Sequence, residues 1–147
     1  MINYHIREIS PQQTLPIRHE AMWPDKPMDY VILPHDEAGQ HYGLFVQNKL
    51  ISVISLFRKG PSAQFRKFAT LTDYHGKGYG TILLKYIMEL AEKEGLNRLW
   101  CNARVHKSGY YHKFGLKETE ECFDKGGISY VVMEKILSKK DESPLSG

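Results

Sequence analysis

The sequence predicts an α/β (α+β) fold, in which strands and helices are mixed along a chain of 147 residues. Three observations predict this class. Short apolar or alternating stretches, typical of strands, recur along the chain. A strongly amphipathic stretch at residues 80–94 has the apolar spacing of a helix. A glycine-rich run separates that helix from the strand before it. The predicted order is strand, helix, loop, three strands, helix, strand, short helix and two strands.

The elements near the N-terminus follow from capping and breaker residues. Asn3 to Ile9 alternates enough to form a first strand. Ser10 suits an N-cap and is followed by a proline at the first helical position, so a helix is expected from Pro11 to about Met22. Pro16 should kink or shorten this helix. Trp23 to Gly39 is rich in proline and indicates a long loop that could include one helical turn, of a length typical of binding loops.

The middle of the chain predicts a hairpin, a strand and the strongest helix. His41 to Gln47 and Leu50 to Phe57 are apolar and are joined by Asn48-Lys49, a hairpin signal. Gln64 to Leu71 is a further strand. The helix from Gly80 to Glu94 ends at Gly95 as a C-cap. Its expected buried stripe consists of Ile82, Leu83, Tyr86, Ile87, Leu90 and Ala91.

The C-terminal part predicts three strands around one short helix. These elements are a strand at Arg98 to Ala103, a helix at Ser108 to Phe114 closed by Gly115, and strands at Leu116 to Phe123 and Ile128 to Ile136. Asp124 to Gly127 is a turn by composition. Ser138 to Gly147 is polar and is expected to be a disordered tail, so the predicted domain is residues 1–137.

Composition excludes several classes of protein. The chain is 41% hydrophobic and 25% charged, as in ordinary globular proteins, and its net charge of +3 is too mild for a nucleic-acid binder. Met1 to Ser10 has no apolar signal region, and no run reaches the length of a membrane span. The two cysteines, Cys101 and Cys122, are expected to be free thiols in a reducing cytoplasm. No His/Cys spacing supports a metal.

The segment between Leu71 and Ile82 carries the clearest functional signal. Its core, His75-Gly76-Lys77-Gly78-Tyr79-Gly80, lies between a predicted strand and a helix N-terminus. Backbone N–H groups without helical partners and the positive end of the helix dipole favour an anion there. Glycine lets the backbone approach a phosphate closely. The segment is therefore a predicted phosphate-binding turn, to which Thr81 could add a hydroxyl.

Three phosphate-binding motifs compete for this turn. The P-loop requires Gly-Lys-Ser/Thr, which is absent. The dinucleotide fingerprint G-x-G-x-x-G fits Gly76 and Gly78 but meets Thr81 at its third glycine. The CoA-binding turn [QR]-x-x-G-x-[GA] fits His75 to Gly80, with histidine at its first position. A tight connection without any ligand is the structural alternative.

Three segments in order resemble the GNAT superfamily of N-acetyltransferases, over Asn3 to about Leu137. They are the strand Phe65 to Leu71 leading into the glycine turn, the strand Leu99 to Arg104, and Lys107 to Leu116, which is similar to the family's small-x-x-aromatic-Tyr-x-x-x-Gly-Phe pattern. His75, Lys107 and Leu116 depart from these patterns. Ser108, one place after Lys107, could take the place of the small residue.

The resemblance implies a GNAT-like mixed, largely antiparallel sheet of six to seven strands, with helices on both faces and two splayed central parallel strands. It implies acetyl-CoA as co-substrate and no metal. The pantetheine arm would pair with the strand edge near Phe68. The residues expected to bind acetyl-CoA are Phe68, Ala69, Thr70, His75, Gly76, Lys77, Gly78, Tyr79, Gly80, Thr81 and Asn102.

The resemblance also assigns the chemistry of amine acetylation. Tyr111 is similar to the family's general acid, which protonates the leaving CoA thiolate, and a phenol keeps its proton at neutral pH. A strand N–H near Phe68 would stabilise the oxyanion. The general base stays open between a water chain and four side chains, because Gln64 to Leu71 has no carboxylate. Those side chains are Asp73, His75, His106 and His112.

The predicted function is transfer of an acetyl group to an amine of a small molecule or peptide by direct attack on the thioester. A non-catalytic acetyl-CoA-binding regulator of a partner protein is the alternative. The loop Trp23 to Gly39 and the turn Asp124 to Gly127 are expected to shape the acceptor site. Arg66 and Arg104 could instead bind an acidic group of the substrate. The loop carboxylates that could face an amine are Asp25, Asp29, Asp36 and Glu37. Family members often form homodimers, which the sequence leaves open; no nucleic-acid or membrane partner is expected.

Overall fold

The computed structural model describes residues 3–137, so the predicted tail at 138–147 lies outside the described residues. The order of elements agrees with the prediction. The elements are β1 Tyr4–Ile9, α1 Pro11–Met22, the 3₁₀ turns η1 Met28–Val31 and η2 Asp36–Ala38, β2 Gln40–Val46, β3 Lys49–Lys59, β4 Ser62–Thr70, η3 Thr72–Tyr74, α2 Tyr79–Lys93, β5 Arg98–Arg104, η4 Val105–Lys107, α3 Ser108–His112, β6 Lys117–Lys125 and β7 Ile128–Ile136. No helix among these is long and apolar enough to cross a membrane.

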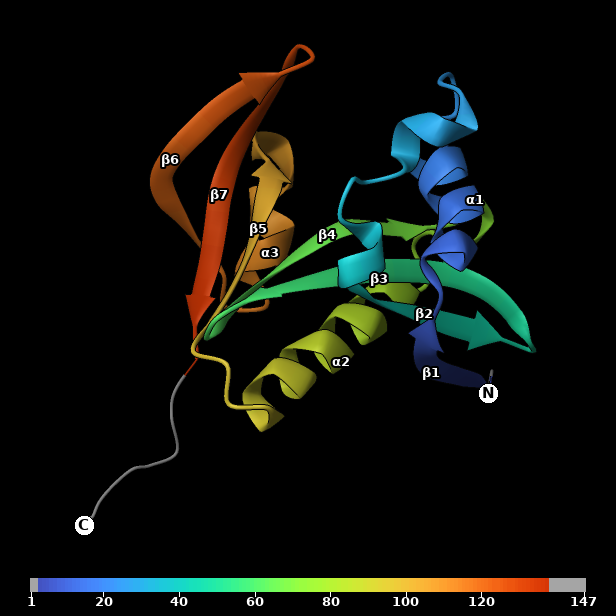
Figure 1. The fold of residues 1–147 in the computed structure, drawn as a ribbon, viewed down its shortest axis with the longest axis horizontal. Coiled ribbons are helices and arrows are strands. Elements are labelled where there is room, and N and C mark those ends of the chain that lie inside the picture. The colour runs from blue at the N-terminus through green and yellow to red at the C-terminus, as the bar shows by residue number, and fades with distance from the viewer. Residues whose placement is uncertain (1–2, 138–147) are drawn as a thin grey trace. The chain divides into compact units, whose positions relative to one another are not determined.

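The strands form a seven-stranded sheet in the order β1-β2-β3-β4-β5-β7-β6 (Figure 1). The β1–β2, β2–β3, β5–β7 and β6–β7 ladders are antiparallel, whereas β4 and β5 pair in parallel. The predicted mixed, largely antiparallel sheet is therefore confirmed. The chain divides into two compact units, and each is described by itself. The first contains Met1–Phe57 and Phe65–Ile87, and the second contains Arg58–Gln64 and Met88–Gly147.

In the first unit, helix α1 begins as its capping residues predict. The Ser10 hydroxyl accepts the N–H of Gln13, and the Gln13 side chain accepts the N–H of Ser10, which completes a capping box. The helix continues through Pro16 to Met22, so the expected shortening is wrong. Pro16 removes one backbone hydrogen bond, and burial of Ile17 beside it favours continuation of the helix.

Helices α1 and α2 lie on opposite faces of the strands of the first unit (Figure 1). One face buries Ile9, Ile17, Phe45, Val53 and Ala69 in a cluster with α1 residues. Tyr42, whose side chain points to the other face because strand residues alternate, approaches Tyr86 of α2 at 6.0 Å between ring centroids. The α2 residues that are fully buried are Leu83, Leu84, Ile87 and Ala91. The buried face of α2 therefore differs from the expected stripe. Leu84, which was not part of that stripe, is buried, whereas Ile82 and Leu90 are only half-buried.

Two tight turns close the hairpins. Gln47 and Asn48 have φ values of 50° and 70°, so the β2–β3 turn lies one residue earlier than the predicted Asn48-Lys49. In the second unit, β6 extends to Lys125, and the turn is confined to Gly126 and Gly127, with φ values of 59° and 79°. Two consecutive residues with positive φ form the turn that suits the twist of paired strands, and glycine adopts them without strain.

The second unit is built around β5. This strand pairs along its length with β7, and over Arg98 to Trp100 it pairs in parallel with Ser62 to Gln64. The parallel ladder thus joins only three residues of each strand. Beyond Arg104 the chain forms η4 and the short helix α3, which begins at Ser108 as predicted and is followed by Gly115 at a φ of 89°.

Candidate active site

The glycine turn of the first unit has the backbone geometry expected of an anion site. Gly76 and Gly78 have φ values of 76° and 86°, which disfavour any side chain. The Gly78 carbonyl accepts the first helical hydrogen bond of α2, from Ile82. The N–H groups of Tyr79 and Gly80 therefore lie in the first turn of α2, where no helical acceptor exists. No acidic residue lies in this turn of α2 to compete for them.

Gly80, the third glycine of the turn, is required by close packing and not by its backbone conformation. A Cβ at Gly80 would come within 3.3 Å of Phe68 Cζ and of Thr70 Oγ1, so the absence of a side chain lets α2 pack closely on β4. The end of β4 is also fixed from the other side, because the buried Ser52 hydroxyl lies 2.8 Å from Thr70 Oγ1. Gly80 thus sets the position of the helix N-terminus relative to the strand.

His75 braces the turn with its side chain. Its Nε2 lies 2.7 Å from the carbonyl oxygen of Thr70 and donates to it, since a carbonyl oxygen only accepts. This contact closes the loop between β4 and α2. The Lys77 side chain is exposed on the same turn and adds positive charge. The histidine that departs from the family motif therefore has a structural role at its first position.

The backbone of β4 is irregular next to the expected pantetheine strand. Lys67 has a φ of 53°, which is rare for a residue with a side chain and interrupts the regular pleat between Arg66 and Phe68. Ala69 is buried in the α1 cluster and Thr70 is bound to Ser52. The side chains of these two residues are used in packing, so their contribution to a ligand would come from the backbone.

Tyr111 and Asn102 belong to the second unit. Tyr111 lies on α3, half-buried, with its ring 5.4 Å from that of Tyr110. Burial raises the pKa of the Tyr111 hydroxyl well above its ordinary value, the neighbouring Cys101 and Tyr110 add to this, and the charge of Arg104 opposes it. The hydroxyl is therefore protonated over the whole pH range in which amines react. Asn102 is exposed on β5, opposite Val132.

The four side chains considered as general base differ in their hydrogen bonds and their exposure. His112 Nε2 lies 2.7 Å from the carboxylate of Glu118, and the hydrogen bond from this histidine lowers the pKa of Glu118. His75 is bound to Thr70. Asp73 and His106 are exposed. Within residues 3–137 no three His, Cys, Asp or Glu side chains gather as a metal site would need.

The loop between α1 and β2 is held by a buried ion pair that the sequence did not indicate. Arg18 is fully buried and binds both oxygens of Asp36, at 2.8 and 2.9 Å. Its guanidinium also donates to the Val31 carbonyl and to the Ser55 hydroxyl. His41 Nε2 donates to the Asp36 carbonyl at 2.8 Å. Asp36 thus faces the protein interior, and the expectation that it could face a substrate amine is wrong.

The other carboxylates of this loop are differently placed. Asp25, Asp29 and Glu37 are exposed, as are Met28 and Tyr30. Burial alone would raise the pKa of Asp36, but the hydrogen bonds from Arg18 and the Leu33 N–H and the charge of Arg18 outweigh burial and lower it. The ionised pair therefore anchors the loop to α1 and β3, while the three exposed carboxylates stay available to solvent.

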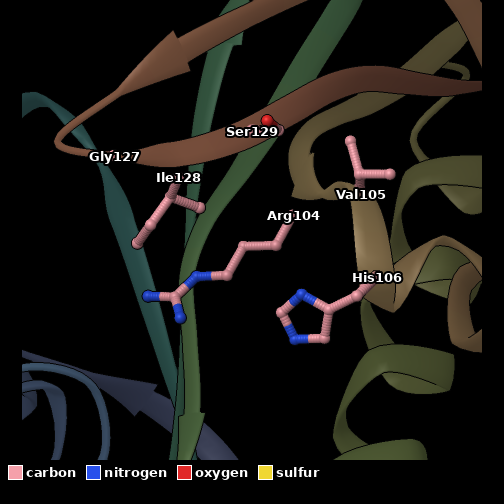
Figure 2. Close-up of a pocket in the computed structure, with 6 residues that line it drawn as sticks. All are labelled: Arg104, Val105, His106, Gly127, Ile128 and Ser129. Carbon is pink, nitrogen blue, oxygen red and sulfur yellow. The ribbon is translucent and has the colours of Figure 1, made fainter.

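A pocket of about 390 Å³ opens at one end of β5 in the second unit (Figure 2). It is lined by Arg104, Val105, His106, Gly127, Ile128 and Ser129. Figure 2 shows the Arg104 side chain extending from the end of β5 and the His106 side chain from η4, with Ile128 and the β6–β7 turn opposite. The Ser129 hydroxyl donates to Asp124 at 2.8 Å, which fixes the end of the hairpin. The sequence indicated the turn and Arg104 separately but not the hollow that they share.

Comparison with known proteins agrees with this arrangement. Residues 7–137 match the family described as "Acetyltransferase (GNAT) domain". The "Uncharacterized N-acetyltransferase YitI" of Bacillus subtilis (strain 168) is 34% identical over 142 residues, covering 90% of this chain and 95% of that protein. The crystal structure of a putative N-acetyltransferase from Lactobacillus plantarum has a TM-score of 0.82 at 20% identity, covering 92% of this chain and 99% of its own. A Bacillus subtilis acetyltransferase solved in complex with CoA has a TM-score of 0.70 at 18% identity, covering 94% and 100%.

The family match over residues 7–137 and the curated N-acetyltransferase relative make this chain an acyltransferase of the acetyl-CoA-dependent class. Its mixed sheet and its glycine turn at a helix N-terminus agree with this class. The chain belongs to the GNAT acetyltransferase family.

Proposed function

We propose that this protein is an N-acetyltransferase that moves the acetyl group of acetyl-CoA to an amine by direct attack on the thioester. The observation that carries the proposal is the glycine turn. Gly76 and Gly78 adopt left-handed backbone conformations just before the N-terminus of α2, and Gly80 allows that helix to pack closely on β4. We assign the CoA pyrophosphate to the backbone N–H groups of this turn, with Lys77 as a nearby positive charge.

The chemistry assigned to Tyr111 follows from its surroundings. In the reaction the amine nitrogen forms a bond to the thioester carbon, the C–S bond breaks, and the proton lost by the nitrogen finally neutralises the thiolate. A thiol has an ordinary pKa of about 8.5 and a phenol one of about 10, and burial raises the pKa of Tyr111 further, so complete proton transfer from this phenol to the thiolate is uphill. Tyr111 therefore acts by donating a hydrogen bond to the sulfur as negative charge develops there.

Two further groups take part in the proposed reaction, an oxyanion donor and a general base. The strand N–H near Phe68 is the candidate oxyanion donor, beside the irregular backbone at Lys67. A water chain is the general base that we propose, since His75 and His112 are engaged in hydrogen bonds and Asp73 and His106 are exposed to solvent. The free cysteines fit a reducing cytoplasm, and a homodimer stays a prediction.

The test combines binding with turnover. Acetyl-CoA at about 100 times its dissociation constant should stabilise the fold by roughly 2.7 kcal/mol, which thermal unfolding would detect. Gly78→Asp should abolish this shift, because it adds a side chain at positive φ and a negative charge at the phosphate position. Release of free CoA thiol with a panel of amines should then identify acceptors. Binding without turnover on any amine would instead favour the non-catalytic regulator.

A further inference from the structure

The pocket at the end of β5 has a positively charged lining. Arg104 is half-buried and is the one strong cation among its six lining residues, none of which is Asp or Glu. Val105 and Ile128 supply apolar walls, and His106 and Ser129 supply polar edges. Figure 2 shows the Arg104 guanidinium extending past Ile128. The lining therefore favours a small ligand with an anionic end and an apolar body.

The shape of the arginine side chain indicates which kind of anionic group it would bind. A guanidinium presents a planar fork of donors that matches the two oxygens of a carboxylate. The adjacent turn is formed by Gly126 and Gly127, which leave its backbone uncovered by side chains. A ligand carboxylate would thus meet Arg104 from β5 without obstruction from the β6–β7 turn.

We propose that the amine acceptor carries a carboxylate, which Arg104 binds in this pocket. The acceptor class is then an amino acid or a similar small amine with an acidic group. This inference rests on the proposed acetyltransferase function and specifies its substrate. Arg104 touches the substrate away from the reacting nitrogen, so it determines specificity.

Arg66, the other arginine considered for acidic groups, does not line this pocket. It is half-buried on β4 in the first unit. Burial and the charge of Arg18 lower its pKa, and the charge of Asp36 acts in the opposite direction.

Binding can be tested without turnover. N-acetyl amino acids, which are products of the proposed reaction, are titrated into the ¹⁵N-labelled protein beside their carboxamides, which lack the charge. The expected result is a saturable shift of the Ile128 and Ser129 amide signals with the carboxylate compounds only, and its loss in Arg104→Met. No shift with any carboxylate compound, or an equal shift in Arg104→Met, overturns the proposal.

Kinetics supply the second test, on matched pairs of an amino acid and its carboxamide. The ratio of kcat/KM within a pair cancels any effect of Arg104 on Tyr111, since both members share it. Arg104→Met should lower the preference for the carboxylate by about 10- to 100-fold, the range of a hydrogen bond to a charged group. Lys117→Met, which removes an exposed cation from the far end of β6, should leave it unchanged.

The outcomes separate this inference from the proposed function. If amines are acetylated but the carboxylate preference is absent, or survives in Arg104→Met, the acceptor proposal is wrong and the acetyltransferase stands. If Arg104→Met instead weakens acetyl-CoA binding, Arg104 belongs to the co-substrate site and the acceptor proposal is wrong. If no amine is acetylated, the proposed function fails, and the titration still decides whether the pocket binds carboxylates.

Discussion

At the scale of single residues, Tyr111 is the group whose surroundings most constrain the chemistry. Replacing it with Phe removes one hydroxyl and little packing. Turnover should fall by about 10²-fold while acetyl-CoA affinity is kept. Steady-state kinetics and a thermal-shift titration measure the two quantities. Unchanged turnover would assign Tyr111 to packing alone.

The pKa of Tyr111 also predicts how the reaction rate changes with pH. Because burial raises the pKa of Tyr111, the protonated form persists above the ordinary range for a phenol. The rate should therefore rise with pH as the amine loses its proton and should show no falling limb from Tyr111 up to a pH of about 10, the ordinary value for a phenol. A falling limb below that pH that disappears in Tyr111→Phe would contradict this.

At the scale of elements, the loop between α1 and β2 depends on one buried ion pair. Asp36→Asn leaves Arg18 charged and fully buried without its anion, so the free energy of unfolding should fall by about 3–5 kcal/mol. Glu37→Gln, at an exposed neighbouring residue, should change it by less than about 0.5 kcal/mol. Urea unfolding at pH 7 compares the two. A similar, small effect of both variants would show that the pair contributes little.

The acid dependence of that pair follows from the lowered pKa of Asp36. The unfolded carboxyl takes up a proton near its usual pKa of 3.8, whereas the folded one does so only at lower pH. The stabilisation is therefore complete above about pH 5 and is lost progressively as the pH falls through the unfolded value to the lowered folded value. Asp36→Asn should lack this part of the acid response.

Which elements could be predicted depends on how local their signals are. Ser10 and Pro11 are neighbours in the chain, so the sequence predicts the start of α1 from a local signal, and the same holds for the glycine turn. The Arg18–Asp36 pair joins residues 18 apart through a fold, and no local pattern indicates it. The buried face of α2 depends on how the helix packs in the fold, and the spacing of apolar residues did not indicate that Leu84 is fully buried. The Arg104 pocket also depends on a long-range approach, between β5 and the β6–β7 turn.

At the scale of the whole molecule, the order of strands and helices followed from periodicity, because each element buries one face. The pairing order β5-β7-β6 did not follow from periodicity. Nothing local in the sequence places β7 between β5 and β6, so this order is known only from the structure. The parallel β4–β5 ladder is likewise a long-range feature, with α2 between its strands in sequence.

Global stability should depend on pH through a group remote from the surface. Cys101 is buried on β5, and burial raises its pKa from 9.0 to about 12. Above pH 9 the unfolded chain releases this thiol proton and the folded chain keeps it, so the free energy of unfolding falls as pH rises. The loss from this group should reach about 1.4 kcal/mol by pH 10.

Urea unfolding at pH 8 and pH 10 checks this expectation. The wild type should lose about 1.4 kcal/mol more over this interval than Cys101→Ala, which has no thiol to titrate. The comparison uses the change with pH, so the cavity created by Cys101→Ala, which lowers stability at both pH values, cancels. Cys122→Ala should follow the wild type, because the Cys122 side chain is exposed and meets water in both states. If Cys101→Ala has the same pH slope as the wild type, the folded protein releases the Cys101 proton as readily as the unfolded chain, and β5 is open to solvent at this position.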